Sequence, residues 1–399
     1  MPDAKYLIVG AGMAADGAVR GIRDLDPDGS IVVVGPESDP PYKRPMLSKG
    51  LWTGAPLEKV WSNTEKKGAD IRLGRTITAI DPDAHFATDD QGETWRYEKL
   101  LLATGSSPRD PGIGNGDVIN FRSLEDYRRL RSVAGNGQRI GVIGGGFIGS
   151  ELAASLTTNG KDVIMIFPEE TISSRVLPPE LGKYMTDYYR EKGVNILNGY
   201  KVASMTKQGD ELALEAKSDA GDQDWEIMVD GVVAGIGAEP NTGLAKKAGL
   251  DIDNGVVVNE HLRTSHADIY AAGDIAAFWQ PALGGRRRVE HEDNARKTGR
   301  VAGKNMAGGE EVYDYLPLFY SDLFDMGYEA VGDVDTRNEI FADWAEPNRK
   351  GVIYYLAEGK VRGVLLWNVW EQVDAARELI KAGAQVTEND LRGRIPMGK

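Results

Sequence analysis

The stretch that decides the fold runs from Ile140 to Glu151 and reads Ile-Gly-Val-Ile-Gly-Gly-Gly-Phe-Ile-Gly-Ser-Glu. An apolar run leads into Gly144, Gly146 and Gly149, which have G-x-G-x-x-G spacing, and the residues that follow favour a helix. A strand, a tight loop and a helix in this order can bind a dinucleotide, because the glycines let the backbone turn sharply and approach a pyrophosphate. The pattern therefore predicts a dinucleotide-binding module.

A second apolar strand is expected over 162–167, and it ends in Pro-Glu-Glu. Glu169 follows Gly149 by about 20 residues, where an acidic side chain accepts hydrogen bonds from a ribose 2'-hydroxyl. A 2'-phosphate would be repelled there, so Glu169 indicates NADH over NADPH, although Arg175 stands close enough to offer a contact for NADPH. The alternative is a structural glycine turn with no ligand.

The N-terminus repeats this module. An apolar strand over 6–9 leads into Gly10, Gly12 and Ala15 at the same spacing, and a helix is expected to about Asp24. The small and apolar residues of this helix share one face, which predicts a buried stripe formed by Ala14, Ala15, Ala18, Val19 and Ile22. Two dinucleotide sites are therefore expected in one chain.

Length and charge limit the class of protein. The chain has 399 residues, enough for two or three domains, and a net charge of -14, which opposes general nucleic-acid binding. The first strand begins at about residue 6, which leaves no room for a signal peptide, and no apolar run approaches the length of a membrane span. We therefore expect a soluble, cytoplasmic protein with no membrane partner.

Cysteine is absent from the sequence. This excludes structural disulfides, thiolate metal sites and electron relay through a thiol. The four histidines, His85, His261, His266 and His291, show no metal-ligand spacing, so no metal site is expected. Redox chemistry, if present, would belong to an organic cofactor.

The remaining chain predicts further elements. Residues 71–96 alternate apolar and polar side chains and predict an antiparallel meander, followed by a buried strand over 99–105. Residues 135–138 read as a polar linker, and 178–192 as a helix. Strands are expected over 201–216 and 225–234, and a further strand within 262–275 ends at Gly273-Asp274.

The C-terminal part differs in character. Apolar strands at 351–356 and 361–367 flank Glu358-Gly359, which indicates a hairpin, and a helix is expected over 371–382. Aromatic residues gather at 313–320, where they could line a cofactor or a subunit contact. The fold class predicted is α/β, with two Rossmann-like modules and a C-terminal α+β domain.

Five motifs in order resemble one family. They are Gly10-x-Gly12-x-x-Ala15, the stretch 41–49 (Pro-Tyr-Lys-Arg-Pro-Met-Leu-Ser-Lys), Leu102-Ala103-Thr104-Gly105, the glycine loop 144–151, and 264–274. Together they resemble the flavoprotein reductases with two dinucleotide domains, in particular the ferredoxin reductases of oxygenase systems and the apoptosis-inducing factor group. The stretches 167–169, 286–291, 321–323 and 327–330 are most similar to the apoptosis-inducing factors.

The resemblance implies a glutathione-reductase-like arrangement of domains. Residues 1–112 and 239–308 would bind FAD, residues 113–238 would bind NAD, and residues 309–399 would form the C-terminal interface domain. The implied cofactor contacts are Gly10, Gly12, Met13, Ala14, Ala15, Glu37, Arg44, Lys49, Ala103, Thr104, Gly105, Gly144, Gly146, Phe147, Ile148, Gly149, Glu151, Glu169, Gly237, Gly273, Asp274, Glu290, His291 and Tyr320.

The resemblance also assigns a catalytic pair. Lys49 and Glu151 match positions that form an ion pair beside flavin N5 in this family, where the ammonium would stabilise negative charge on the reduced ring. From the residues alone, Glu151 could equally be an ordinary glutamate favoured by the helix dipole. The chain departs from the family at Pro36, where Glu37 follows one place later than the usual acidic residue, and at Glu292 and Tyr320, where tryptophan is common.

The function implied is an NADH-dependent FAD oxidoreductase. Hydride would pass from NADH to flavin N5, and electrons would pass on to a small [2Fe-2S] ferredoxin. The alternative is an oxidoreductase similar to apoptosis-inducing factor that uses quinone or dioxygen, or acts as a redox sensor. A scaffold that keeps FAD as a structural ligand is a third reading, and the oligomeric state could be monomer or homodimer.

Overall fold

The computed structural model describes residues 3–221 and 223–398, apart from the side chain of Asn115. The chain divides into two compact units. Unit 1 contains Met1–Arg44, Leu57–Ser107 and Glu239–Phe319, and unit 2 contains Pro45–Pro56, Pro108–Ala238 and Tyr320–Lys399. The three-domain boundaries given above stay a prediction.

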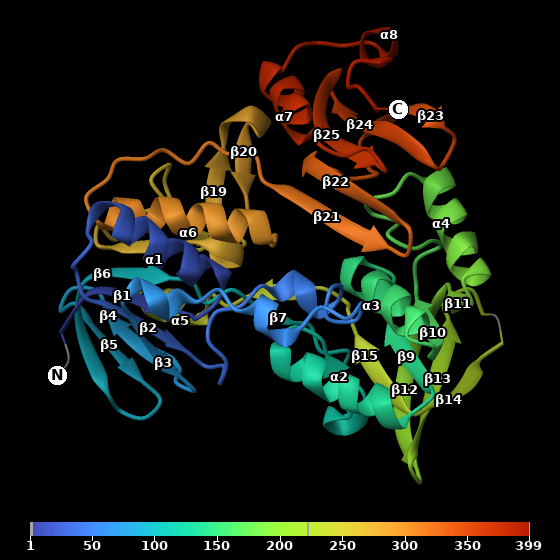
Figure 1. The fold of residues 1–399 in the computed structure, drawn as a ribbon, viewed down its shortest axis with the longest axis horizontal. Helices are drawn as coiled ribbons and strands as arrows, with labels where there is room; N and C mark the ends of the chain where they lie inside the picture. The colour runs from blue at the N-terminus through green and yellow to red at the C-terminus, as the bar shows by residue number, and fades with distance from the viewer. Residues whose placement is uncertain (1–2, 222, 399) are drawn as a thin grey trace. The chain divides into compact units, whose positions relative to one another are not determined.

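Unit 1 is built on a seven-stranded sheet in the order β3-β2-β1-β6-β5-β4, with β18 also paired to β6 (Figure 1). The strands β1, β2 and β3 run parallel, as do β1 and β6. The elements of unit 1 are β1 (Asp3–Val9), α1 (Met13–Leu25), β2 (Ile31–Gly35), β3 (Ala69–Leu73), β4 (Ile77–Asp81), β5 (Phe86–Asp89), β6 (Thr94–Leu102), α5 (Gly243–Lys247), β17 (Val256–Val257), β18 (Ile269–Ala271), β19 (Ala276–Gln280), β20 (Gly285–Arg287) and α6 (Glu292–Met306).

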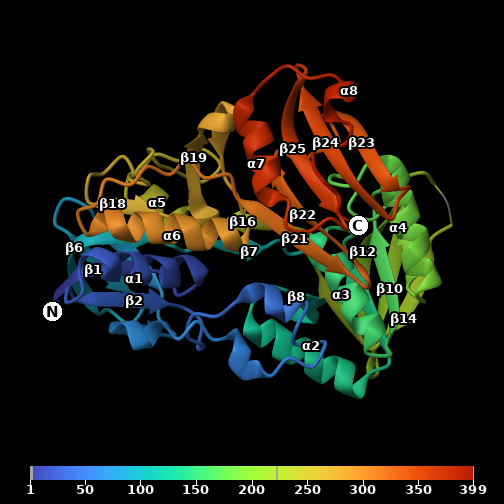
Figure 2. The ribbon, with the colours of Figure 1, turned by 45° about the horizontal axis from the view of Figure 1, so that its top comes forward.

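Helices α1 and α6 lie side by side in both ribbon views (Figures 1 and 2). Their backbones approach closely at glycines on both helices: a Cβ added to Gly299 would lie 2.2 Å from Ala14 O, and one added to Gly303 would lie 2.2 Å from Ala18 O. On α1, a Cβ on Gly21 would lie 2.1 Å from Arg300 O. The helix pair therefore requires glycine at these contacts.

Unit 2 contains a five-stranded sheet in the order β11-β10-β9-β15-β8, and each pair of neighbouring strands runs parallel. A second five-stranded sheet, β21-β22-β25-β24-β23, comes from the C-terminal part of the chain, and β12, β13 and β14 form a third sheet. The elements are β8 (Val118–Asn120), α2 (Leu124–Asn136), β9 (Arg139–Ile143), α3 (Phe147–Thr158), β10 (Asp162–Phe167), α4 (Pro179–Glu191), β11 (Asn195–Asn198), β12 (Tyr200–Gln208), β13 (Glu211–Ser218), β14 (Trp225–Val229), β15 (Gly231–Ala234), β22 (Met326–Gly332), β23 (Glu339–Glu346), β24 (Lys350–Ala357), β25 (Lys360–Trp367), α7 (Val373–Ala382) and α8 (Glu388–Leu391).

Three strands fall at the boundaries between units in the sequence: β7 (Ser106–Pro108), β16 (Ala238–Pro240) and β21 (Leu318–Leu323). From Tyr320 onward, β21 belongs to unit 2. The short 3-10 helix η1 (Arg44–Leu47) is also divided in this way.

Several sequence predictions are confirmed. The strand over 162–167 is β10 with the same bounds, and all five residues of the small apolar stripe on α1 are buried. The hairpin between β24 and β25 turns at Glu358 and Gly359, both with positive φ, as a type I' turn requires.

Three predictions were wrong. β3 belongs to the parallel sheet through its pairing with β2, so only β4, β5 and β6 form the antiparallel meander. Residues Gly135 and Asn136 are the last turn of α2 rather than a linker. The strand expected within 262–275 is limited to β18 and is followed by a 3-10 turn (η5, Gly273–Ile275).

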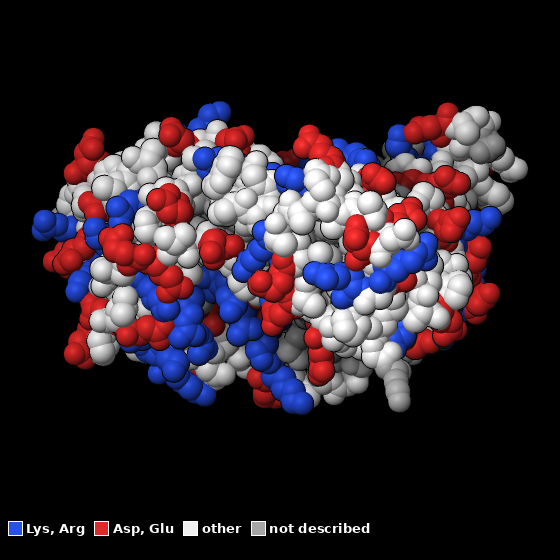
Figure 3. Space-filling view, turned by 90° about the horizontal axis from the view of Figure 1, so that it is seen from above, with Lys and Arg blue, Asp and Glu red and all other residues white. Residues whose placement is uncertain are grey.

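The negative net charge does not give a surface of a single sign. On the face drawn in Figure 3, lysine and arginine side chains are interspersed with aspartate and glutamate. Local patches of either sign are therefore compatible with the net charge of -14.

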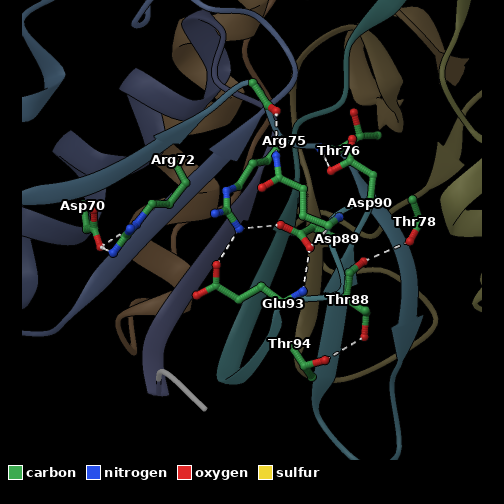
Figure 4. Close-up of polar contacts among 12 residues, drawn as sticks. Asp70, Arg72, Arg75, Thr76, Thr78, Thr88, Asp89, Asp90, Glu93 and Thr94 are labelled. Carbon is green, nitrogen blue, oxygen red and sulfur yellow. Dashed lines mark hydrogen bonds and ion pairs between the residues drawn. The ribbon is translucent and has the colours of Figure 1, made fainter.

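One ionic cluster in unit 1 fastens the β4–β5 hairpin (Figure 4). The Arg75 guanidinium lies 2.8 Å from the buried Asp89 carboxylate and also pairs with Glu93. Asp89 Oδ1 accepts from the backbone N–H groups of Gln91 and Glu93 at 3.0 and 2.8 Å. Burial alone would raise the pKa of Asp89, but these donors outweigh it and hold the pKa below its usual range.

Candidate functional site

The two glycine loops have the same local geometry. Gly10 and Gly144 begin the loops with φ of 112° and 108°, a region that favours glycine. A Cβ added to Gly12 or to Gly146 would meet nothing within 4 Å, whereas one added to Gly149 would lie 2.0 Å from Gly144 O. The middle glycine of each loop therefore leaves open space above the backbone, as a bound pyrophosphate requires.

Each loop is also packed against the turn that follows a neighbouring strand. In unit 1, a Cβ on Gly10 would lie 2.1 Å from Ala103 O, in the Ala-Thr-Gly turn after β6. In unit 2, a Cβ on Gly144 would lie 2.6 Å from Gly235 O, after β15. The turn at Thr104 and Gly105 is fixed by Asn241, which donates to Thr104 O at 2.9 Å. The shared packing supports two copies of one nucleotide-binding plan.

Lys49 and Glu151 lie together in unit 2. Lys49 Nζ is 3.0 Å from Glu151 Oε1, and both side chains are largely buried. The ammonium also lies 4.0 Å from the ring centroid of Tyr320, and it donates to the Tyr320 carbonyl at 3.4 Å. Whether this pair contacts a flavin stays a prediction.

Two serines that the sequence analysis did not select as site residues also contact Glu151. Ser48 Oγ donates to Glu151 Oε2 at 2.6 Å, and Ser321 Oγ donates to Glu151 Oε1 at 2.6 Å. Both serines are at most 2 % exposed. Ser48 lies in the stretch 41–49 and Ser321 in the stretch 321–323, both of which carry the family resemblance, and this was the available signal for them.

The segment that carries Lys49 is anchored to two helices of unit 2. Ser155 Oγ, one turn after Glu151 on α3, donates to Ser48 O at 2.6 Å. Asn159 donates to Trp52 O at 3.0 Å, and the Tyr127 hydroxyl of α2 donates to Leu51 O at 3.3 Å. The position of Lys49 is therefore set by helices of unit 2.

Glu37 and Arg44 form an ion pair in unit 1. The Tyr42 hydroxyl donates to Glu37 Oε2 at 2.6 Å and accepts from Arg44 Nη1 at 2.6 Å. The three side chains stand just after β2, where a Rossmann module places the acidic residue for a ribose. The structure thus brings together two residues that the resemblance selected separately.

The stretch 273–274 lies beside the start of α1. A Cβ on Gly273 would lie 3.0 Å from Ala14 Cβ, and Gly273 N donates to the Thr298 hydroxyl at 2.9 Å. Asp274 is buried and accepts from Ser106 Oγ at 2.7 Å. Asp274 therefore stands close to the glycine loop of unit 1.

Glu290 and His291 precede α6. Glu290 pairs with Arg288, which also donates to Asp274 O at 3.1 Å. The imidazole of His291 stacks on Phe319 with ring centroids 4.5 Å apart. Burial lowers the pKa of His291 to about 4, although Asp274 and Asp293 oppose this shift.

Glu169 and Glu170 are exposed directly after β10. Arg175 lies 3.5 Å from Asp335, and Thr336 donates to Arg175 O at 3.0 Å. Arg175, the arginine that could contact a 2'-phosphate, therefore lies beside a carboxylate of the C-terminal region, and its side chain is 78 % exposed.

The selected residues divide between the units. Unit 1 holds Gly10, Gly12, Met13, Ala14, Ala15, Glu37, Arg44, Ala103, Thr104, Gly105, Gly273, Asp274, Glu290 and His291, and unit 2 holds Lys49, Gly144, Gly146, Phe147, Ile148, Gly149, Glu151, Glu169, Gly237 and Tyr320. Of the cofactor contacts implied within 1–112 and 239–308, Lys49 thus lies in the same unit as the second glycine loop.

The described residues offer neither a metal site nor a helical membrane span. Among residues 3–221 and 223–398, no group of three or more histidine, aspartate or glutamate side chains could hold a metal ion. No helix in the same described ranges is long and apolar enough to cross a membrane.

Comparison with known families gives two matches. The model of the pyridine nucleotide-disulphide oxidoreductases matches residues 4–299. The model of the C-terminal region of mitochondrion-associated apoptosis-inducing factor matches residues 343–382.

Individual relatives cover nearly the whole chain. Apoptosis-inducing factor 1 of Dictyostelium discoideum is 34 % identical over 94 % of this chain and 78 % of its own length. The ferredoxin--NAD(+) reductase component of the anthranilate 1,2-dioxygenase system of Burkholderia cepacia is 34 % identical over 97 % of this chain and 96 % of its own length. The solved putidaredoxin reductase–putidaredoxin complex has a chain that is 28 % identical, with a TM-score of 0.88 over 98 % of this chain and 95 % of that one. The chain therefore belongs to the pyridine nucleotide-disulphide oxidoreductase family, in the subgroup that contains ferredoxin reductases and apoptosis-inducing factors.

Proposed function

We propose that this chain is a cytoplasmic, NADH-dependent FAD oxidoreductase that passes electrons to a small [2Fe-2S] ferredoxin. The observation that carries the proposal is the buried Lys49–Glu151 pair in a chain with two open glycine loops. A protein that kept FAD only as a structural ligand would have no use for such a pair. When bound, FAD and NADH supply the hydride transfer from nicotinamide to flavin N5.

The chain's own residues bind and orient these groups. Backbone N–H groups at the starts of α1 and α3 would donate to pyrophosphate oxygens in the open space beside Gly12 and Gly146. Glu169 would accept from the ribose hydroxyls of NADH, and the carboxylates of Glu37 and Asp274 would hold FAD. The N-terminal loop would bind FAD and the second loop NAD.

Lys49 would stabilise negative charge on the flavin, with Glu151 fixing the direction of the ammonium. This role of Lys49 and Glu151 does not require a thiol. The family name includes disulphide chemistry, but the sequence has no cysteine, so a thiol–disulfide relay is excluded. Electrons must therefore leave through an external acceptor.

The ferredoxin assignment has support from relatives at 34 % and 28 % identity whose names specify ferredoxin--NAD(+) reductase and putidaredoxin reductase. A second candidate has support of its own. The match of residues 343–382 to the C-terminal region of apoptosis-inducing factor favours an oxidoreductase that uses quinone or dioxygen, or acts as a redox sensor.

Stopped-flow mixing of the FAD-loaded protein with NADH tests the proposal. We expect rapid bleaching of flavin absorbance, whereas a flavin that stays oxidised over minutes would leave only the scaffold reading. Candidate [2Fe-2S] ferredoxins, with cytochrome c as final acceptor, then separate the two oxidoreductases. Turnover with quinone or dioxygen but none with any ferredoxin would favour the second candidate.

A further inference from the structure

The Glu151 carboxylate accepts hydrogen bonds from two serines in addition to its ion pair with Lys49. Its Oε1 accepts from Lys49 Nζ at 3.0 Å and from Ser321 Oγ at 2.6 Å, and its Oε2 accepts from Ser48 Oγ at 2.6 Å. An ionised carboxylate is only an acceptor, and each serine has one hydroxyl hydrogen to donate. Both serine hydrogens are therefore directed at the same carboxylate.

The two serines reach Glu151 from different parts of the chain. Ser48 lies on the segment Pro45–Pro56, and Ser321 lies on β21, the edge strand of the C-terminal sheet. Glu151 itself stands on α3 and is 5 % exposed. Two donors on opposite oxygens leave the carboxylate little freedom to rotate.

Strand β21 also contacts the other member of the pair. Tyr320, the residue before Ser321, accepts from Lys49 Nζ through its carbonyl and places its ring 4.0 Å from that ammonium. Consecutive residues of a strand point to opposite faces, so one strand can support the lysine and the glutamate at once. The C-terminal sheet thus contributes to a pair whose members come from elsewhere.

Two buried tyrosines, Tyr189 and Tyr328, lie close enough to Glu151 to sense its charge. Tyr328, on the neighbouring strand β22, is fully buried, and Tyr189 donates to Ser150 O at 3.1 Å. Burial and the charge of Glu151 raise the pKa of both phenols well above their ordinary range, so both remain neutral. Glu151 therefore has no second anion beside it from these groups.

We propose that Ser321 is a positioning residue for the proposed flavin chemistry: its hydroxyl locks Glu151 in the rotamer that holds Lys49 in place. Ser48 performs the same task at the other carboxylate oxygen. This inference rests on the proposed function, because it assumes that Lys49 acts on a bound flavin. It adds that the C-terminal sheet sets the reactivity of the pair.

The test is a double-mutant cycle between Ser321→Ala and Glu151→Ala, with the rate constant of flavin reduction by NADH as the first readout. Because a hydrogen bond to a charged group is lost, we expect Ser321→Ala to slow reduction by about tenfold. In the Glu151→Ala background the same change should have less than about a twofold effect, since the group that Ser321 positions is gone. Ser321→Thr, which keeps the hydroxyl, should restore the rate.

The midpoint potential of the bound flavin is the second readout. It should fall in Ser321→Ala and return in Ser321→Thr, because a misplaced Lys49 stabilises negative charge on the flavin less. Ser204→Ala is the matched control: Ser204 also donates to a glutamate of unit 2, Glu215, at 2.9 Å, but on the β12–β13 pair. This control should change neither the rate constant nor the potential.

Several results would overturn the inference while leaving the proposed function intact. They are a native rate in Ser321→Ala, an equal loss in the Glu151→Ala background, or no recovery with Ser321→Thr. If Ser321→Ala does not retain FAD, Ser48→Ala carries the same cycle and the same expectations. Failure of the native protein to be reduced by NADH would instead contradict the proposed function.

Discussion

Lys49 is the residue on which the proposed chemistry depends most. Removing its ammonium should cost transition-state stabilisation, while the FAD contacts implied in unit 1 stay in place. We expect Lys49→Ala to slow flavin reduction by NADH on the order of a hundredfold while FAD content stays close to native. Stopped-flow reduction and the flavin-to-protein absorbance ratio measure the two quantities.

The exposed Lys59→Ala serves as the control for charge, because Lys59 lies in a 3-10 turn of unit 1. It should reduce at the native rate. If Lys49→Ala merely loses FAD and reduces normally once FAD is restored, the assigned role is wrong.

Glu169 sets the expected preference between dinucleotides. It is exposed directly after β10, and Arg175 lies 3.5 Å from Asp335, so the 2'-phosphate of NADPH would meet the Glu169 carboxylate. We expect Glu169→Ala to raise the ratio of kcat/KM for NADPH over NADH by about tenfold. Steady-state kinetics with both dinucleotides measure the ratio.

Glu170→Ala is the matched control, because Glu170 is adjacent and equally exposed. An unchanged ratio in Glu169→Ala, together with a large change in Glu170→Ala, would transfer the discrimination to the neighbouring carboxylate.

Among the elements, helices α1 and α6 can pack closely only because the residues at their contacts are glycines. A Cβ on Gly303 would lie 2.2 Å from the backbone oxygen of Ala18, so one helix would have to move. We expect Gly303→Ala to lower the free energy of unfolding by about 3 kcal/mol, the upper range for overpacking a well-packed contact. Urea or thermal unfolding of the FAD-loaded protein measures it.

Gly135→Ala provides the contrast. Gly135 is also helical, in the last turn of α2, but a Cβ there would meet nothing within 4 Å. Because alanine favours helix over glycine, this change should be neutral or stabilising by up to about 1 kcal/mol. If Gly303→Ala were no less stable than Gly135→Ala, the two helices would have absorbed the added methyl group without strain, and the close contact would not control stability.

Some elements could be predicted from the sequence, and others could not. The strand–loop–helix units at Gly10 and Gly144 were predictable because their signal is local: the positive φ and the close approach require glycine at fixed spacing. The partner of β3 was not predictable, since alternation of side chains reveals a strand but not the strand beside it. The end of α2 was missed because Gly135 and Asn136 have low helix propensity, yet the hydrogen bond from Gly137 N to Val133 O carries the last helical turn through them.

The candidate site could also be predicted from the sequence only in part. Lys49 and Glu151 were selected through resemblance, and their role stays a prediction. The donors that hold Glu151 come from Ser48 and from Ser321, which is 170 residues away along the chain. No periodicity connects positions so far apart, so only the fold could reveal that two serines share one carboxylate.

The whole molecule combines the fold of its family with a sequence that has no cysteine, and together these restrict the routes by which electrons can leave. The family fold supplies two nucleotide modules, and the composition removes the thiol route by which such a fold could reduce disulfides. Acceptor choice must then depend on the surface, where the face in Figure 3 shows both signs of charge intermixed. Ferredoxin docking would therefore rely on a local patch rather than on the net charge.

Acid should destabilise the molecule in two stages. Folding keeps His291 neutral by burial, with a pKa of about 4 against an ordinary 6.5, so between these values the unfolded chain gains a proton that the folded chain does not. Below about pH 4, carboxylates whose pKa is depressed by an arginine become protonated and lose their ion pairs. Asp89 with Arg75 is one such pair. Asp335 with Arg337 is another, and their side-chain hydrogen bond lowers the pKa of Asp335 to about 2. Stability present at pH 7 is thus lost in separate windows.

The first window can be assigned to one residue. Between pH 7 and pH 5 we expect His291 to account for a loss of about 2 kcal/mol in the free energy of unfolding. His291→Phe keeps an aromatic ring for stacking on Phe319 and should remove most of this loss, as urea unfolding at the two pH values with FAD held constant would measure. From pH 7 to pH 8 the two proteins should show the same dependence, because His291 is neutral in both folded and unfolded chains. An equal loss in His291→Phe between pH 7 and pH 5 would mean that another group takes up the proton on unfolding.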